Sequence, residues 1–163
     1  MNEQTVSIAT ADGEMTAYTF RPGDGGPLPA VILYMDAPGI REELFDFCRR
    51  IANQGYYTLL PDMYYRLGEL RFDLSKMVDP DSPVRKQMFD AMGTLNNKRV
   101  MDDTRGMLDF LGADPHVKDG PTGCLGFCMS GKYVVSVAGT YPEHFAAADS
   151  LYGVGIVTDQ DDS

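Results

Sequence analysis

The chain has 163 residues, of which 44% are hydrophobic and 23% charged, and its formal net charge is −10. This length and apolar content suffice for one domain with a buried core, and they exclude a disordered or low-complexity protein. The acidic balance argues against nucleic acid and anionic membrane surfaces as partners, because both reward an excess of Lys and Arg.

The amino terminus is polar and lacks the basic and apolar regions of a signal peptide. The longest apolar run, residues 30–35, is too short to span a bilayer. The odd number of cysteines (Cys48, Cys124 and Cys128) indicates reduced thiols rather than disulfides. We therefore expect a cytoplasmic protein that has no membrane span.

Two short alternating runs, residues 6–10 and 15–20, flank an Asp-Gly turn and predict a β-hairpin. Residues 30–35 form a continuous apolar run, which is typical of a strand buried on both faces of a parallel sheet. A helical pattern follows over residues 42–54. The next strand is predicted over residues 56–60, and Pro61 ends it.

The second half of the chain alternates helices and strands. A long connection, residues 63–83, precedes a short predicted helix over 85–92 and a longer one over 98–111. A strand at 122–127, a helix at 129–140 and a strand at 145–152 follow, so the pattern predicts βαβ units and a mainly parallel sheet. Because no linker interrupts the pattern, we expect a single domain over residues 1–163.

Cys128 is the most informative residue. It stands between the predicted strand 122–127 and the predicted helix 129–140, with Gly126 two residues before it and Ser130 two residues after it. Small residues at these positions let strand and helix approach closely, so that a reactive side chain stands clear of the backbone. A cysteine in such a turn predicts a thiol nucleophile, because the thiolate is the attacking species. The alternative is a buried cysteine at a strand end.

Four segments carry a resemblance to a known family: Met-Asp-Ala-Pro-Gly at 35–39, Leu-Pro-Asp-Met-Tyr at 60–64, Gly-Phe-Cys-Met-Ser-Gly at 126–131 and Ser-Leu-Tyr-Gly-Val-Gly at 150–155. In their order and spacing the chain resembles the dienelactone hydrolase (carboxymethylenebutenolidase-like) family, which usually has Gly where Ser130 stands. The resemblance implies an α/β-hydrolase fold, with helices on both faces of a mainly parallel central sheet. It also implies hydrolysis of a small ester or lactone by a cysteine nucleophile through an acyl-enzyme.

The resemblance also implies roles for residues around the thiol. The backbone N–H groups of Ala37 and Met129 would form the oxyanion hole. Asp36 stands where the family has an acidic residue, usually Glu, that exchanges a proton with the thiol; alternatively, it caps the following helix or ties its own turn. Arg85 corresponds to an Arg that helps to bind a substrate carboxylate. Tyr64 is a second candidate for substrate binding, and the alternative is that it packs under a loop.

Members of the family use a Cys-His-Asp triad in which the Asp and then the His follow the nucleophile in the chain. After Cys128 the only histidine is His144, and it directly precedes a predicted strand, as does His116. Ligand sites in open parallel sheets lie at the carboxyl ends of the strands, so we expect neither histidine to be the catalytic base. The chain then corresponds to the first two-thirds of a longer hydrolase, an α/β-hydrolase domain that lacks its last strands and helices.

From this we expect the 163-residue chain alone to be poorly soluble or to associate through an apolar edge strand at residues 145–152. We also expect it to be hydrolytically inactive, even if Cys128 still reacts with alkylating agents. The His and Cys spacings match no zinc pattern, and we expect neither a metal nor a cofactor. The oligomeric state stays open. The alternative to an enzyme is a non-catalytic, hydrolase-like binding domain or an inactive truncated chain.

Overall fold

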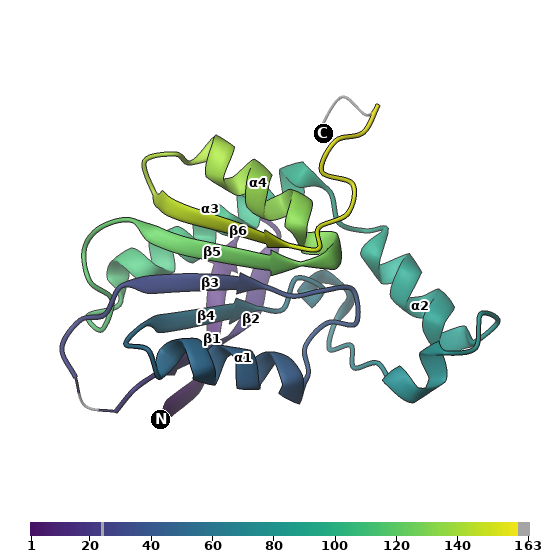
Figure 1. Cartoon of the computed structure of the whole chain (residues 1–163), viewed down its shortest axis with the longest axis horizontal. Coiled ribbons are helices and arrows are strands. Elements are labelled where there is room, and N and C mark those ends of the chain that lie inside the picture. Colours follow the sequence, from purple (N-terminus) through teal and green to yellow (C-terminus); the bar gives the residue numbers. More distant parts are fainter. Residues whose placement is uncertain (24, 160–163) are drawn as a thin grey trace.

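The described part of the chain folds around a six-stranded sheet with the strand order β1-β2-β4-β3-β5-β6 (Figure 1). The computed structural model describes residues 1–23 and 25–159. The strands are β1 (Asn2–Thr10), β2 (Gly13–Arg21), β3 (Ala30–Tyr34), β4 (Tyr57–Pro61), β5 (Thr122–Phe127) and β6 (Phe145–Leu151). The helices are α1 (Glu42–Ala52), α2 (Pro83–Met92), α3 (Asn97–Ala113) and α4 (Gly131–Thr140), with 3₁₀ turns η1 (Tyr65–Leu67), η2 (Leu74–Met77) and η3 (Cys128–Ser130).

The sheet is mainly parallel. Strands β4, β3, β5 and β6 run in one direction, whereas the β1–β2 hairpin joins β4 in antiparallel orientation. This arrangement confirms the predicted α/β-hydrolase fold class. The hairpin is longer than predicted, because β1 pairs with β2 from Asn2↔Arg21 onward. Its first residues are polar and lie on an edge strand, where no apolar alternation marks them.

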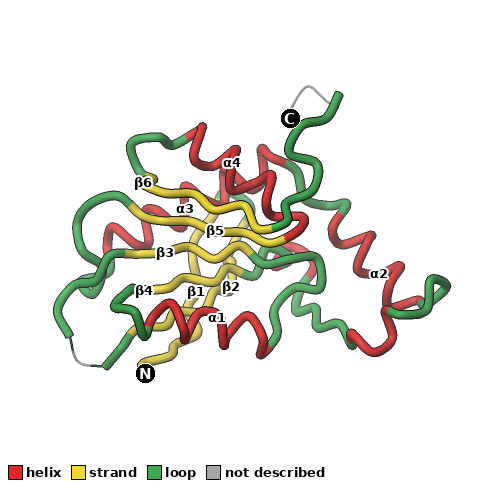
Figure 2. Tube along the Cα trace, in the orientation of Figure 1, coloured by secondary structure: helices red, strands yellow, loops and turns green. Residues whose placement is uncertain are grey.

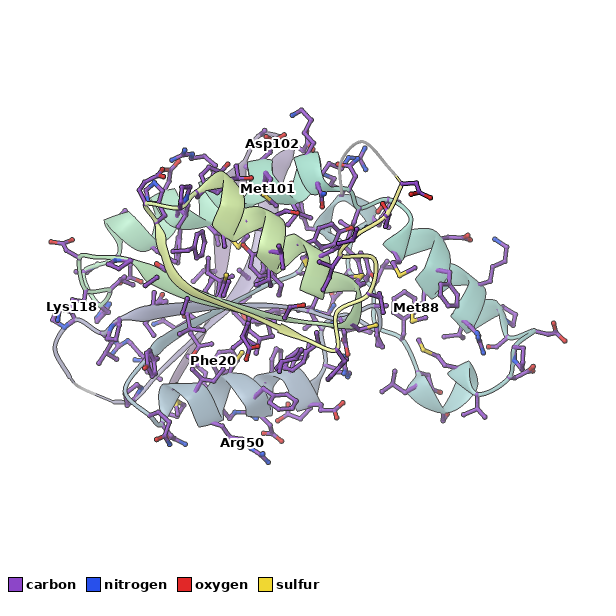
Figure 3. All side chains as sticks on the ribbon, turned by 45° about the horizontal axis from the view of Figure 1, so that its top comes forward. Phe20, Arg50, Met88, Met101, Asp102 and Lys118 are labelled. Atoms are coloured by element: carbon purple, nitrogen blue, oxygen red, sulfur yellow. The ribbon has the colours of Figure 1, made fainter. Side chains whose placement is uncertain are left out.

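Helices cover both faces of the sheet (Figures 1 and 3). Helix α1 lies on one face, and α3 and α4 lie together on the other. Helix α2 lies beside the sheet rather than over a face, at the end toward which β3, β5 and β6 run (Figure 2). Within residues 1–23 and 25–159, no helix has both the length and the apolar content that a membrane crossing requires.

The core follows from the spacing of the apolar residues. In β3, Ile32, Leu33 and Tyr34 are fully buried, as expected for a strand that helices cover on both sides. On α1, Leu44 and Cys48 lie four residues apart and are both buried, so one stripe of the helix faces the sheet. By contrast β6 is an outer strand, and its residues 146–149 are exposed.

Helices α2 and α3 begin slightly before the predicted positions, and local chemistry explains both starts. The side chain of Asn96 accepts a hydrogen bond from the N–H of Arg99, which caps α3. Pro83 occupies the start of α2, where its missing N–H would have no partner in the helix.

A buried carboxylate joins the connection after β4 to α3. Asp103 on α3 is 3% exposed and accepts hydrogen bonds from both terminal nitrogens of Arg66, at 2.8 and 2.7 Å. The hydroxyl of Tyr65 donates to the same carboxylate at 2.9 Å. The Nε of Arg66 donates to Asp12 in the β1–β2 turn at 2.7 Å. One ion-pair network therefore fixes η1, the hairpin and α3 relative to one another.

We expect Asp103→Ala to lower the free energy of unfolding by about 3 kcal/mol, because it leaves a half-buried guanidinium without its main partner. Urea denaturation monitored by circular dichroism measures the change. The matched control is Asp102→Ala, which removes a surface pair with Lys98 and should change stability by less than about 0.5 kcal/mol. Equal unfolding midpoints for the two variants would contradict a structural role of the network.

Candidate active site

Cys128 lies in a sharp turn between β5 and the helical segment that starts with η3. Its φ angle is +51°, in the left-handed region that residues other than glycine rarely adopt. Such strain persists where the surroundings enforce it, and it turns the side chain out of the line of the strand. The backbone therefore has the conformation that the sequence predicts for a nucleophile elbow.

Small residues make the turn possible. A Cβ atom on Gly126 would lie 2.6 Å from Cγ2 of Val134 and 2.8 Å from the carbonyl oxygen of Ser130, so any side chain there would separate β5 from α4. Ser130 is fully buried, and its hydroxyl donates to the carbonyl oxygen of Met35. Ser130 thus ties the turn to the loop after β3.

The three thiols differ in accessibility. Cys128 is partly exposed, whereas Cys48 is 0% and Cys124 is 4% exposed. Burial raises the pKa of the Cys124 thiol to about 12. Burial raises the pKa of the Cys48 thiol as well, and the nearby Arg49 opposes this only in part. Cys48 and Cys124 are therefore structural thiols that stay protonated at neutral pH.

Asp36 lies in the loop after β3, two residues beyond the strand, and pairs with Arg41. The two terminal nitrogens of Arg41 donate to the two carboxylate oxygens of Asp36 at 2.5 and 2.8 Å, and one of them also reaches the carbonyl oxygen of Gly39. The N–H of Gly39 donates to the carbonyl oxygen of Asp36 at 3.0 Å. In this arrangement Asp36 ties its own turn, the second of the two predicted roles. Proton exchange with Cys128 stays a prediction.

The predicted oxyanion-hole residues, Ala37 and Met129, both contact the hydroxyl of Tyr64. The hydroxyl of Tyr64 donates to the carbonyl oxygen of Ala37 at 2.9 Å and lies 3.6 Å from Sδ of Met129. Tyr64 itself is 1% exposed and lies under the loop after β3. Tyr64 is therefore covered by the loop, and its hydroxyl contacts the loop backbone. Direct binding of a substrate by Tyr64 stays a prediction.

Arg85 lies on α2, the helix beside the sheet (Figure 1). Its guanidinium carbon is 5.7 Å from the ring centroid of Phe89, one turn further along the helix. This contact does not join Arg85 to the turn at Cys128. Binding of a substrate carboxylate by Arg85 stays a prediction.

Both histidines lie at the opposite end of the sheet from Cys128. The carbonyl oxygen of His144 accepts a hydrogen bond from the N–H of Thr122, the first residue of β5. His116 precedes β5 and pairs through Nδ1 with Asp114 at 2.9 Å. Because β5 rises by about 3.3 Å per residue, Thr122 and Cys128 are separated by roughly 20 Å. Neither imidazole is placed to take a proton from the thiol.

Sequence reasoning missed a row of aromatic side chains beside the turn. Phe127 lies between Phe47 of α1, at a centroid distance of 5.2 Å, and Tyr152, at 5.8 Å. The N–H of Val154 donates to the carbonyl oxygen of Cys128, so the segment after β6 wraps around the turn. Segment 150–155 is one of the four that carry the family resemblance, so the sequence pointed to the part of this row after β6. Phe47 lies on α1, far away in the chain, and no local pattern places it beside Phe127.

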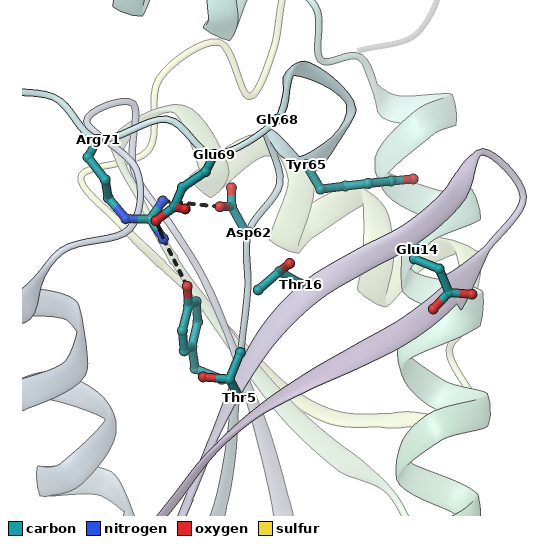
Figure 4. A pocket seen from close by; sticks show the side chains of 9 residues that line it. Thr5, Glu14, Thr16, Asp62, Tyr65, Gly68, Glu69 and Arg71 are labelled. Carbon is teal, nitrogen blue, oxygen red and sulfur yellow. Dashed lines mark hydrogen bonds and ion pairs between the residues drawn. The ribbon is translucent and has the colours of Figure 1, made fainter.

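A polar hollow of about 290 Å³ lies elsewhere, between the β1–β2 hairpin and the connection after β4 (Figure 4). Asp62 in its wall pairs with Arg71 at 3.3 Å, and Arg71 also donates to the hydroxyl of Tyr18 at 2.8 Å. These three side chains therefore satisfy one another's hydrogen bonds within the wall of the hollow. Among the residues that the structure describes, no group of three or more His, Cys, Asp or Glu side chains is arranged to hold a metal ion.

Comparison with known proteins gives a consistent result. The family model described as "Dienelactone hydrolase family" matches residues 15–163. A "Putative carboxymethylenebutenolidase" from Methylorubrum extorquens is 28% identical over 127 residues, which are 78% of this chain and 41% of the relative. A "Probable 2-oxo-3-(5-oxofuran-2-ylidene)propanoate lactonase" from a Bradyrhizobium species is 30% identical over 135 residues, 83% of this chain and 50% of the relative. The chain spans about half the length of the curated relatives it matches.

Solved structures agree with these relatives. The crystal structure of a "Putative Dienelactone Hydrolase" from Klebsiella pneumoniae superposes with a TM-score of 0.80 at 26% identity, covering 99% of this chain and 64% of the other. A dienelactone hydrolase-like phosphotriesterase from metagenomic libraries has a TM-score of 0.71 at 20% identity, which shows a shared fold.

We expect iodoacetamide to label Cys128 at least about tenfold faster than Cys48 or Cys124 in the folded protein, because reactivity follows exposure and thiolate fraction. Mass spectrometry of the digested protein over a time course measures the three rates. In urea all three cysteines should react at similar rates, which serves as the control. Equal rates in the folded protein would argue against Cys128 as a reactive thiol.

Proposed function

Because this chain belongs to the dienelactone hydrolase family, we propose that it cleaves a small ester or lactone with Cys128 as the nucleophile. The observation that carries the proposal is the left-handed backbone of Cys128 at the start of η3, with a partly exposed thiol. The two other thiols of the chain are buried and protonated, which leaves Cys128 as the candidate.

The reaction begins when the thiolate sulfur of Cys128 attacks the carbonyl carbon of the substrate. A C–S bond forms, and the carbonyl oxygen becomes an oxyanion that the N–H groups of Ala37 and Met129 stabilise. The intermediate collapses with cleavage of the C–O bond, and the leaving alkoxide takes a proton from solvent. A thioester on Cys128 remains; in a lactone, the alcohol stays attached to the acyl chain. Water then hydrolyses the thioester to the free acid and the thiol.

The two halves of this reaction make different demands on the chain. Attack needs a sulfur nucleophile and oxyanion donors; Cys128 would be the nucleophile, and the N–H groups of Ala37 and Met129 would be the donors. Hydrolysis of the thioester needs a base that activates water, and both histidines lie at the other end of the sheet. We therefore propose that this chain forms the thioester readily and releases the acid slowly. Arg85 is the candidate for binding an anionic part of the substrate.

With p-nitrophenyl acetate, we expect a burst of about one equivalent of p-nitrophenol per chain, followed by slow release. Intact-mass spectrometry should find one acetyl group, located on Cys128. Cys128→Ala should abolish the burst, and the matched control Cys124→Ala should retain it, because Cys124 is buried in β5. A burst that survives Cys128→Ala would refute the assignment. The absence of any acylation in the wild type would favour a non-catalytic binding domain.

We expect His116→Ala and His144→Ala to leave the burst rate and the later release within about twofold of the wild type, since both residues lie at the end of the sheet where β5 begins, opposite the thiol. Stopped-flow absorbance measures the burst, and steady-state absorbance measures the release. Loss of a general base slows a reaction by about a hundredfold or more. A decrease of that size in either variant would show that the chain contains its own base.

A further inference from the structure

We propose that Tyr64 is a positioning residue that holds the oxyanion-hole loop in its working conformation, rather than a residue that binds the substrate. The inference rests on the proposed function and deepens it, because it concerns the oxyanion that forms when Cys128 attacks. Tyr64 is 1% exposed, and its hydroxyl donates to the carbonyl oxygen of Ala37 at 2.9 Å. Because Tyr64 is buried, its influence on the reaction would come from positioning the backbone of Ala37 rather than from contact with the substrate.

The loop after β3 is fixed at almost every carbonyl oxygen. Ser130 donates to that of Met35, the N–H of Gly39 to that of Asp36, and Arg41 to that of Gly39. The carbonyl oxygen of Ala37 is held by the Tyr64 hydroxyl. The hydrogen bond fixes the peptide plane that follows the Cα of Ala37, and the bond from Gly39 to Asp36 fixes the preceding plane, which carries the Ala37 N–H. Tyr64 thus completes a set of anchors that orients the Ala37 N–H.

The ring of Tyr64 is fixed by its neighbours. Gly39 has a φ angle of +74°, and a Cβ atom on it would lie 3.4 Å from Cε2 of Tyr64. The positive φ angle favours glycine at this position, and the ring lies in van der Waals contact with it. On another side, Phe72 stacks edge-on at a centroid distance of 6.4 Å. The hydroxyl consequently has little freedom to leave Ala37.

The same hydroxyl reaches the second half of the oxyanion hole. Sδ of Met129 lies 3.6 Å from it, and Met129 is the residue after the nucleophile. Burial raises the pKa of the Tyr64 hydroxyl, and the charges of Asp36 and Cys128 raise it further. The phenol therefore remains a neutral donor at physiological pH. One buried group thus holds the carbonyl of Ala37 and contacts the side chain of Met129, the two residues whose N–H groups would face the developing negative charge.

This role predicts a specific pattern of reactivity. Acyl transfer to Cys128 builds an oxyanion and depends on oriented N–H groups, whereas alkylation by iodoacetamide is a direct displacement without an oxyanion. The test compares wild type with Tyr64→Phe, which keeps the ring and removes the hydroxyl. Removal of an oxyanion donor slows catalysis by about 10²–10³, and we expect loosening of one to slow the p-nitrophenyl acetate burst by about tenfold. The alkylation rate of Cys128 should stay within about twofold.

The matched control is Tyr57→Phe. Tyr57 is the first residue of β4 and is as buried as Tyr64, and its hydroxyl donates to Asp114 at 2.7 Å. This variant should leave both rates unchanged even if it lowers the unfolding midpoint. An unchanged burst in Tyr64→Phe, or an equal slowing of acylation and alkylation, would overturn the positioning role.

Amide hydrogen exchange separates this inference from the proposed function. The N–H groups of Ala37 and Gly39 should exchange faster in Tyr64→Phe than in the wild type or in Tyr57→Phe. If wild-type Cys128 is alkylated but never acylated, the proposed function fails. Amide hydrogen exchange then tests whether Tyr64 anchors the loop. Faster exchange of Ala37 and Gly39 in Tyr64→Phe supports the anchoring role, and unchanged exchange overturns it.

Discussion

The parallel pairing of β3 with β5 is the constraint on which the candidate site depends. Tyr34 at the end of β3 is in register with Gly126, two residues before Cys128. Both strands therefore end at the same edge of the sheet, and the loop that starts with Met35 leaves beside the turn that carries the thiol. The hydrogen bond from Ser130 to Met35 joins the two across this edge. A slip by one residue would move Cys128 to the other face and separate it from the loop.

The site combines a fixed frame with one accessible reactive group. Burial and hydrogen bonds hold Tyr64, Ser130 and the Asp36–Arg41 pair, so little rearrangement is available to them. Cys128 and the exposed ring of Tyr152 face the solvent at the same edge. Groups that stabilise a developing charge work best when they are already oriented, because turning them during the reaction would add to the barrier. The arrangement of this edge meets that requirement.

The sequence indicated the main features of this arrangement where a local pattern encodes them. The apolar run at 30–35, the glycine before Cys128 and the alternation of helices and strands each have a direct structural reading, and the α/β-hydrolase fold followed from them. Features that depend on distant partners could not be read in this way. The burial of Tyr64, for example, depends on packing against Gly39 and Phe72. The polar start of β1 gave no signal because an edge strand exposes it.

The left-handed backbone of Cys128 lowers the stability of the fold at the residue that carries the accessible thiol. A residue with a Cβ atom in this conformation costs about 1 kcal/mol relative to glycine. Cys128→Gly would therefore relax the turn and stabilise the fold while it removes the thiol. Substitutions chosen for thermal stability alone would favour glycine at this position. A screen for stabilising variants of this protein would thus select against the thiol at this turn.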